Sequence, residues 1–162
     1  MNEALVVVFS WSGNTRRVGS DIAQRLKCPM VEITEVRKRE GGLAYLRSIY
    51  EVLTGRLPEL EKFSRNLREF PLLVVGTPVW AGHVSSPMRS FLAAHREDGG
   101  MLCAFCTMGG RDPGSTFSEI AMVSGKVLGA TLALSEREQG SPEYSVRIDE
   151  FTATIRSLPH SA

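Results

Sequence analysis

Three short polar segments contain the residues of this chain whose types and spacing could do chemistry. The first, "SWSGNT" (10–15), surrounds one glycine with hydroxyl and amide side chains directly after an apolar run. A turn of this composition at the start of a helix can bind a phosphate through backbone N–H groups and neutral donors. Two other interpretations stay open at this point: an ordinary strand-to-helix turn, and the pocket of a nucleophile.

Two arginines, Arg16 and Arg17, follow this segment at the start of the expected helix. Cations in the first turn of a helix oppose its macrodipole and cost stability. A bound dianion would reverse the sign of that interaction. The alternative is that both side chains extend into solvent.

Other phosphate-binding and phosphate-transfer motifs are excluded by the sequence of these segments. There is no Lys before Ser or Thr, as a Walker loop requires, and no G-x-G-x-x-G dinucleotide fingerprint. The run "VVVFSWS" (6–12) supplies no carboxylate of the kind a response regulator needs. Cys106 and Arg111 have four residues between them, whereas phosphatases with a P-loop cysteine need five. A nucleophilic role for Cys106 is therefore a remote alternative.

The second and third segments follow later apolar runs. In "PVWAGH" (78–83), Trp80 could stack on a planar heterocycle or cap the core beneath the loop. His83 is a candidate general acid or hydrogen-bond donor, or a simply exposed loop histidine. In the third segment, "CTMGGRDPGS" (106–115), Thr107 could bind the carbonyl and imide edge of a ring, and Gly109 and Gly110 allow the backbone to approach a ligand closely.

Length and composition indicate one soluble globular domain spanning residues 1–162. The chain has 43% hydrophobic and 23% charged residues and a formal net charge of +1, which argues against nucleic-acid binding. It contains no apolar run long enough to span a membrane, and the N-terminus does not resemble a signal peptide, so we expect a cytoplasmic protein. Cys103 and Cys106 have metal-ligand spacing, but on a strand they point to opposite faces, so we expect no metal site.

The elements that must position these segments alternate between strands and helices. Apolar runs predict strands over 4–9, 30–33, 71–77, 101–107 and 130–135. Segments with helical spacing cover 14–26, 85–95, 114–129 and 144–158, and the last should bury Val146, Phe151 and Ile155. Such alternation predicts a doubly wound α/β sandwich with parallel strands.

Residues 34–70 form an extended crossover with an extra helix. Leu43, Leu46, Tyr50 and Leu53 recur there at helical intervals, which predicts a helix that covers the sheet. The alternative is a lid near the ligand or a contact between subunits of a homo-oligomer.

Taken together, the three segments resemble the flavodoxin-like family, which includes flavodoxins and flavodoxin-like NAD(P)H:quinone oxidoreductases. "SWSGNT" is similar to the family's FMN-phosphate loop, "GTPVWAGHVSSPMRSFL" (76–92) to its ring-contacting loop, and "CTMGG" (106–110) to the loop at the pyrimidine edge of the flavin. The resemblance spans nearly the whole chain. It implies a three-layer α/β/α sandwich with a five-stranded parallel sheet in the order 2-1-3-4-5, and non-covalent FMN at its carboxyl edge.

The resemblance also implies which residues contact FMN. They are Ser10, Trp11, Ser12, Gly13, Asn14 and Thr15 at the phosphate, and Pro78, Val79, Trp80, Ala81, Gly82 and His83 on one side of the ring, with Thr107, Met108, Gly109 and Gly110 on the other. No catalytic side chain is assigned, because the flavin would carry the chemistry, although His83 is a candidate.

Two departures from the flavodoxin pattern favour an NAD(P)H-dependent oxidoreductase that passes electrons to a quinone or another small acceptor. The second loop has no carboxylate, so the local field opposes anionic reduced FMN less than an electron carrier requires. The third loop has Met108 where carriers usually place an aromatic, which leaves one flavin face open. The alternatives are a one-electron carrier that docks to redox partner proteins and a binding module that has lost its flavin.

Overall fold

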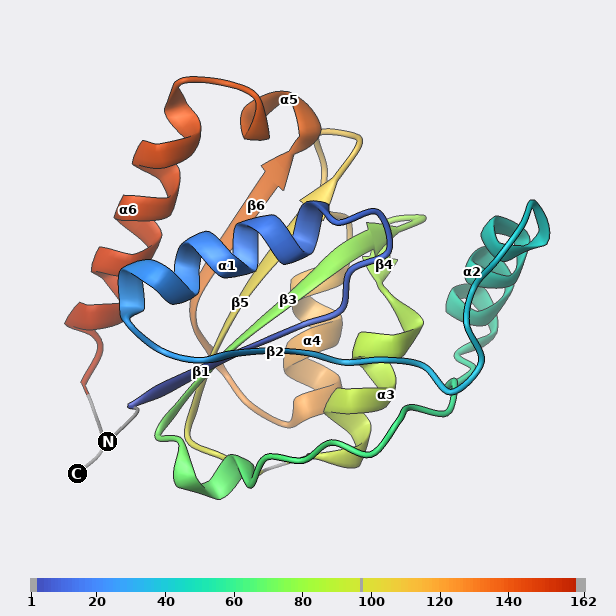
Figure 1. Ribbon diagram of the computed structural model, residues 1–162, viewed down its shortest axis with the longest axis horizontal. Coiled ribbons are helices and arrows are strands. Elements are labelled where there is room, and N and C mark those ends of the chain that lie inside the picture. The colour runs from blue at the N-terminus through green and yellow to red at the C-terminus, as the bar shows by residue number, and fades with distance from the viewer. Residues whose placement is uncertain (1–2, 97, 160–162) are drawn as a thin grey trace.

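Five parallel strands form the central sheet of this computed structural model, which describes residues 3–96 and 98–159. Their order across the sheet is β2-β1-β3-β5-β6, so the crossover order expected from the sequence is present. The strands are β1 (Ala4–Val8), β2 (Met30–Glu32), β3 (Leu72–Trp80), β5 (Met101–Met108) and β6 (Leu128–Ser135). Because all five run in one direction, their carboxyl ends meet at one edge, where the predicted site residues lie (Figure 1).

A sixth strand, β4 (His83–Val84), corrects the expectation of a purely parallel five-stranded sheet. It pairs antiparallel with the end of β3, which extends to Trp80. The two turn residues between them, Ala81 and Gly82, have φ angles of 50° and 79°. Positive φ at both central positions is the geometry of the tightest β-hairpins. The sequence did not indicate it, because alanine seldom adopts positive φ.

Helices cover both faces of the sheet. They are α1 (Asn14–Leu26), α2 (Leu43–Thr54), α3 (Ser86–Ala94), α4 (Thr116–Ser124), α5 (Glu136–Gln139) and α6 (Glu143–Ser157), with a short 3-10 turn, η1 (Leu67–Glu69). Helices α1 and α6 lie on one face, and α3 and α4 on the other (Figure 1). None of the helices in the described ranges is long and apolar enough to cross a membrane.

Successive strand residues point alternately into two separate hydrophobic cores, one on each face of the sheet. On β1, Leu5 and Val7 pack toward α3 and α4, whereas Val6 and Val8 pack toward α1 and α6. All four are fully buried. This is why the strands read as continuous apolar runs: both faces of the sheet are covered.

Two helix predictions need correction near the C-terminus. The expected helix over 114–129 ends at Ser124, because Gly125 adopts a φ of 71° and terminates it. Val146 is 54% exposed and Ile148 occupies the core position instead. Phe151 and Ile155 are buried, as predicted.

The crossover between β2 and β3 carries α2, and its orientation contradicts the expectation from the sequence. Leu43, Leu46, Tyr50 and Leu53 are all exposed and face solvent instead of covering the sheet. In Figure 1, α2 stands beside the rest of the molecule near the carboxyl edge of the sheet. Its inward face is formed by Ala44, Ser48, Glu51 and Val52.

Candidate functional site

The segment 10–15 forms a tight turn that leads directly into α1. The Ser10 hydroxyl accepts hydrogen bonds from the backbone N–H groups of Gly13 and Arg16, each at 3.2 Å. Gly13 has a φ of 98°, a conformation in which glycine is favoured over residues with a Cβ. The Ser10 side chain thus fixes the turn from within and binds one of the first N–H groups of the helix.

Several donors in this turn have no acceptor among the described residues. They are the backbone N–H groups of Asn14 and Thr15 and the side chains of Ser12 and Asn14. The first N–H groups of a helix lack intrahelical partners and carry the positive end of the macrodipole. Neutral donors that converge on a helix start match the chemistry of a phosphate group, so the residues present fit the predicted phosphate site.

From the sequence, Arg16 and Arg17 were expected either to bind an anion or to extend into solvent. The structure shows a third arrangement: both are exposed, but each has a partner within the protein. Arg16 donates from Nε and Nη2 to the Glu32 carboxylate at 2.6 and 2.8 Å. Arg17 donates to the Gln139 carbonyl at 3.2 Å and stacks over the Tyr144 ring. The Glu32 carboxylate therefore compensates the positive charge of Arg16 at the start of α1, and no bound anion is needed for this.

The first and third segments are joined by a buried hydrogen bond. Thr15 Oγ1 and Thr107 Oγ1 lie 2.8 Å apart, although 92 residues separate them in sequence. Beyond Thr107, Met108 is buried, and Gly109 and Gly110 have open space where a Cβ would lie. The predicted phosphate loop and the predicted pyrimidine-edge loop are therefore neighbours.

The second segment is the β3–β4 hairpin, and it is tied to the third. Ser115 donates to the Gly82 carbonyl from its backbone N–H at 2.9 Å. Gly114 lies so close that a Cβ there would come within 2.3 Å of the same carbonyl oxygen. The structure thus brings all three predicted segments to one edge of the sheet.

Trp80 is buried at the base of the hairpin, with 8% of its surface exposed. It packs edge-on against Phe9 and Trp11, with ring centroids 5.6 and 5.7 Å away, and the Arg39 guanidinium lies 4.7 Å above its ring. Trp11 is 42% exposed. At this edge Trp11 therefore presents more aromatic surface than Trp80 does.

Arg39 belongs to a buried charge network that sequence reasoning missed. Its guanidinium donates to Glu35 at 2.7 and 2.8 Å, to Glu51, and to the hydroxyls of Ser48 and Ser86 at 3.1 Å. Arg47 donates to Glu51 at 2.8 Å. Two carboxylates thus face two guanidiniums and the charge balances. The spacing of these residues along the sequence does not indicate the network, because the partners of Arg39 come from a loop, from α2 and from α3.

The two carboxyls of this network titrate differently. Burial raises the pKa of Glu35, and its hydrogen bond with Arg39 offsets only part of that increase. For Glu51, burial acts in the same direction, but hydrogen bonds from Arg39, Ser86 and Arg47 outweigh it and lower the pKa. Glu51 is therefore held as a carboxylate at the contact between α2 and α3.

His83 is held by a carboxylate that the sequence did not single out. Its Nδ1 is hydrogen-bonded to Glu119 and lies 3.1 Å from the Ser115 hydroxyl. Arg89 donates to the other oxygen of Glu119 at 2.9 Å. Burial would raise the pKa of Glu119, but hydrogen bonds from Ser115, His83 and Arg89 outweigh it and lower the pKa. Nε2 of His83 has no partner in the described part of the chain.

The cysteines of the apolar strand are poor nucleophiles. Cys103 and Cys106 are both fully buried. Burial raises the pKa of the Cys103 thiol to about 11 and that of Cys106 to about 12. Because the thiolate is the reactive form, Cys106 does not suit nucleophilic catalysis at neutral pH. No three His, Cys, Asp or Glu side chains cluster as metal ligands within residues 3–96 and 98–159.

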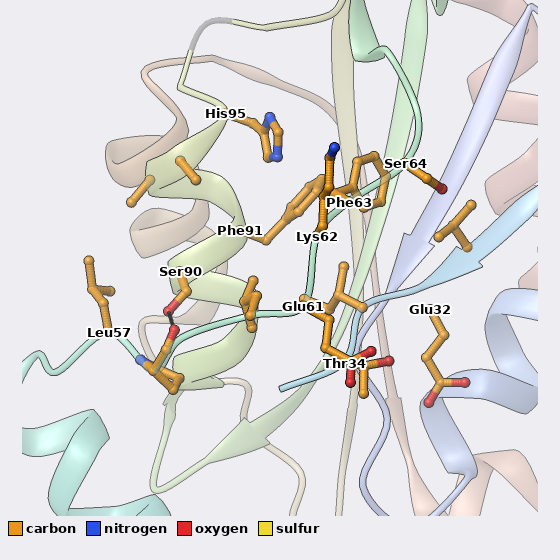
Figure 2. Close-up of a pocket in the computed structure, with 16 residues that line it drawn as sticks. Glu32, Thr34, Leu57, Glu61, Lys62, Phe63, Ser64, Ser90, Phe91 and His95 are labelled. Atoms are coloured by element: carbon orange, nitrogen blue, oxygen red, sulfur yellow. Dashed lines mark hydrogen bonds between the residues drawn. The ribbon is translucent and has the colours of Figure 1, made fainter. Parts of the chain in front are cut away.

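Two hollows are lined by none of the predicted site residues. One, of about 680 Å³, lies between the β2 edge, the segment 57–64 and α3. Figure 2 shows Phe63, Phe91 and His95 around it, and the rings of Phe63 and Phe91 are 5.0 Å apart. The other, of about 740 Å³, lies between residues 37–40 and α2.

Comparison with solved structures finds the same fold in proteins described as flavoproteins. A flavoprotein from Lactobacillus acidophilus NCFM in complex with FMN matches with a TM-score of 0.72, 18% identity, and coverage of 94% of this chain and 99% of the other. The fold is flavodoxin-like. A candidate flavoprotein from Bacteroides eggerthii matches with a TM-score of 0.78 and 17% identity over 98% of this chain and 100% of the other.

A protein described as a WrbA-like flavodoxin has the same fold. The flavodoxin WrbA-like protein from Agrobacterium tumefaciens matches with a TM-score of 0.60 and 15% identity over 99% of this chain and 100% of the other. No family model matches the sequence, and no curated protein matches it. At such low identities the flavodoxin-like likeness is one of fold.

The lowered pKa of Glu119 predicts an acid-dependent contribution to stability. Its carboxylate stabilises the fold above the ordinary carboxyl pKa of about 4.3, and this is lost as the pH falls through the lower pKa of the folded state. We expect Glu119→Gln to lower the Tm at neutral pH and the difference from wild type to shrink as the pH falls below the ordinary carboxyl pKa. Thermal melts of both proteins between neutral and acidic pH measure this difference in Tm. Glu150→Gln, on the exposed side of α6, is the control and should show no such convergence.

The Arg39 network predicts a large loss of stability when its centre is removed. Arg39→Met leaves Glu35 and Glu51 buried, with Arg47 to serve both, and should lower the free energy of unfolding by about 3–5 kcal/mol. Urea denaturation measures this. Arg16→Met removes a pair whose arginine is exposed and should cost about 1 kcal/mol or less. Equal effects of the two substitutions would contradict a special role for the buried network.

Proposed function

We propose that this chain binds FMN and works as an NAD(P)H-dependent oxidoreductase that passes electrons to a quinone or another small acceptor. The observation that carries the proposal is the set of unpartnered donors at the start of α1, on the edge where the three predicted segments meet. The fold supports it, since the flavoprotein from Lactobacillus acidophilus with the same fold was solved with FMN.

The side chains of this edge have distinct roles in the proposal. Ser12, Asn14 and the N–H groups of Asn14 and Thr15 would bind the phosphate, while the Ser10 hydroxyl keeps the turn in shape. The β3–β4 hairpin and the segment 107–110 would border the ring, with Trp11 as its exposed aromatic neighbour. Bound FMN would accept a hydride from NAD(P)H and pass two electrons to the acceptor.

Charges around the edge favour a reductase over a low-potential carrier. The nearby carboxylates are paired: Glu32 with Arg16, and Glu35 and Glu51 with Arg39. Asp112, on the third segment, accepts the N–H of Gly114 at 2.8 Å. Compensated carboxylates destabilise an anionic reduced flavin less than free ones do.

His83 is the candidate proton donor in this proposal. Reduction of a quinone by NAD(P)H consumes one hydride and one proton, and the proton must come from solvent or a side chain. The Glu119 carboxylate fixes Nδ1 and so the orientation of the ring, while Nε2 stays available. A carboxylate-oriented imidazole is suited to relaying such a proton.

Phosphate recognition predicts a difference between FMN and riboflavin, which lacks the phosphate. We expect the double variant Ser12→Ala/Asn14→Ala to bind FMN at least about tenfold more weakly, since each hydrogen bond to a charged group contributes about 1.5–3 kcal/mol. Its affinity for riboflavin should not change. Quenching of flavin fluorescence measures both affinities. Ser20→Ala, exposed on α1, is the matched control. An equal loss for both flavins would contradict the phosphate assignment.

The reaction is tested by anaerobic titration of the FMN-reconstituted protein with NADH and NADPH. Bleaching of the visible flavin absorbance in one two-electron step, followed by recovery on addition of a quinone, is expected for the oxidoreductase. No bleaching with either nucleotide, but reduction by dithionite in two resolved one-electron steps, would instead identify a carrier. Failure to bind flavin would overturn the whole proposal.

A further inference from the structure

Helix α2 presents its apolar residues to solvent. Leu43, Leu46, Tyr50 and Leu53 are 76%, 60%, 53% and 67% exposed. We call these four residues the α2 stripe. Single exposed apolar side chains are ordinary on protein surfaces, but a contiguous row of them marks an interaction site.

The orientation of α2 is fixed by the residues on its other side. Ser48 and Glu51 are buried and bound to Arg39, and Glu51 also accepts a hydrogen bond from Ser86 of α3 at 2.7 Å. Turning the stripe inward would expose this network's partners and leave Arg39 buried without them. The α2 stripe therefore stays outward in the folded monomer.

The spacing of the stripe is that of a helix-pairing seam. Its members are separated by three, four and three residues, the pattern of two facing positions per heptad. This spacing reads the same in both directions about position 48. An antiparallel pair of identical helices with a two-fold axis at that level would place Leu43 opposite Leu53 and Leu46 opposite Tyr50 of the other copy.

Charges at the two ends of α2 follow the same symmetry. Glu40 precedes the helix and Arg56 follows it, both are exposed, and they lie eight positions on either side of Ser48. In the antiparallel pair each Glu40 would face the Arg56 of the other copy. Arg56 is held at its end of the helix by stacking over the Tyr50 ring at 5.6 Å. Two-fold interfaces require this kind of self-complementary surface.

We propose that the α2 stripe is the interface of a homodimer in which the α2 helices of two copies pack antiparallel about position 48. The hollow of about 740 Å³ beside the stripe, lined by Leu43, Leu46 and Tyr50, would receive side chains of the other copy. Because Arg39 joins the α2 network to Trp80, the second copy lies on the same side of the molecule as the predicted flavin edge. The inference does not depend on FMN.

An anionic lipid surface is the competing occupant. Arg37 and Lys38 are exposed near the stripe, and a row of apolar side chains with cations beside it also suits a membrane interface. The matched positions of Glu40 and Arg56 favour a second copy, since a lipid surface gives an acidic residue no partner.

Sedimentation velocity of the full chain tests the dimer. Concentrations of roughly 1–200 μM suit the weak association expected of a small interface. We expect a concentration-dependent monomer–dimer equilibrium that Leu46→Glu/Leu53→Glu weakens at least about 100-fold. Val127→Glu, which replaces a 91% exposed apolar residue after α4, is the matched control and should not change it. Circular dichroism should show all variants folded, because these side chains are exposed in the monomer.

Charge exchange tests the antiparallel arrangement. Glu40→Arg alone and Arg56→Glu alone each place like charges at both ends and should weaken the dimer about tenfold. Mixing the two variants in equal amounts should restore wild-type affinity, since positions 40 and 56 then carry opposite charges at both ends of the mixed dimer. A parallel pair predicts another pattern: wild type and both single variants would all carry like charges at both ends, so neither variant would weaken the dimer and the mixed dimer would be tighter than wild type.

Three results would overturn the proposal. They are a monomer at every concentration, a dimer that Leu46→Glu/Leu53→Glu leaves intact, and no recovery in the mixed charge variants. Binding of the monomer to vesicles of phosphatidylserine and phosphatidylcholine, without self-association, would instead assign the α2 stripe to a membrane surface.

Discussion

The buried guanidinium of Arg39 determines how the least regular part of this fold is arranged. It joins the loop before α2, α2 itself, α3 and the ring of Trp80 through ion pairs, hydroxyl contacts and one stacking contact. A buried charge is costly unless it is fully paired. The long crossover therefore has one favourable way to pack, with its polar residues inside. The outward apolar row on α2 and the covered face of Trp80 both follow from that constraint.

Much of the sandwich could be predicted from the sequence because it depends on local patterns. The boundaries of α1 at Asn14 and Leu26 follow from a glycine turn and a regular apolar stripe. The strands are continuous apolar runs because helices cover both faces of the sheet. Each of these signals lies within one short segment. The core residues Phe151 and Ile155 were predictable for the same reason.

The errors arose where a local pattern had two physical meanings. Apolar spacing along α2 indicates that one side of the helix is apolar, but not whether that side faces the protein or solvent. The answer depends on Glu35, Arg39 and Ser86, which lie in other segments. The meeting of Thr15 with Thr107 follows from the strand order, whereas the link between His83 and Glu119 requires the hairpin that ends at β4. The sequence therefore predicted the three segments better than their supporting contacts.

The β3–β4 hairpin has a consequence for the thermodynamics of ligand capture. Its backbone is already constrained by pairing of Trp80 with His83, by the 2.8 Å hydrogen bond between Thr77 and Ser85, and by the Ser115 contact to Gly82. Ordering a mobile loop on binding costs conformational entropy. Here that cost is met during folding of the chain. A ligand at this edge loses little affinity to loop ordering on the hairpin side, so its residence time depends mainly on the contacts it makes.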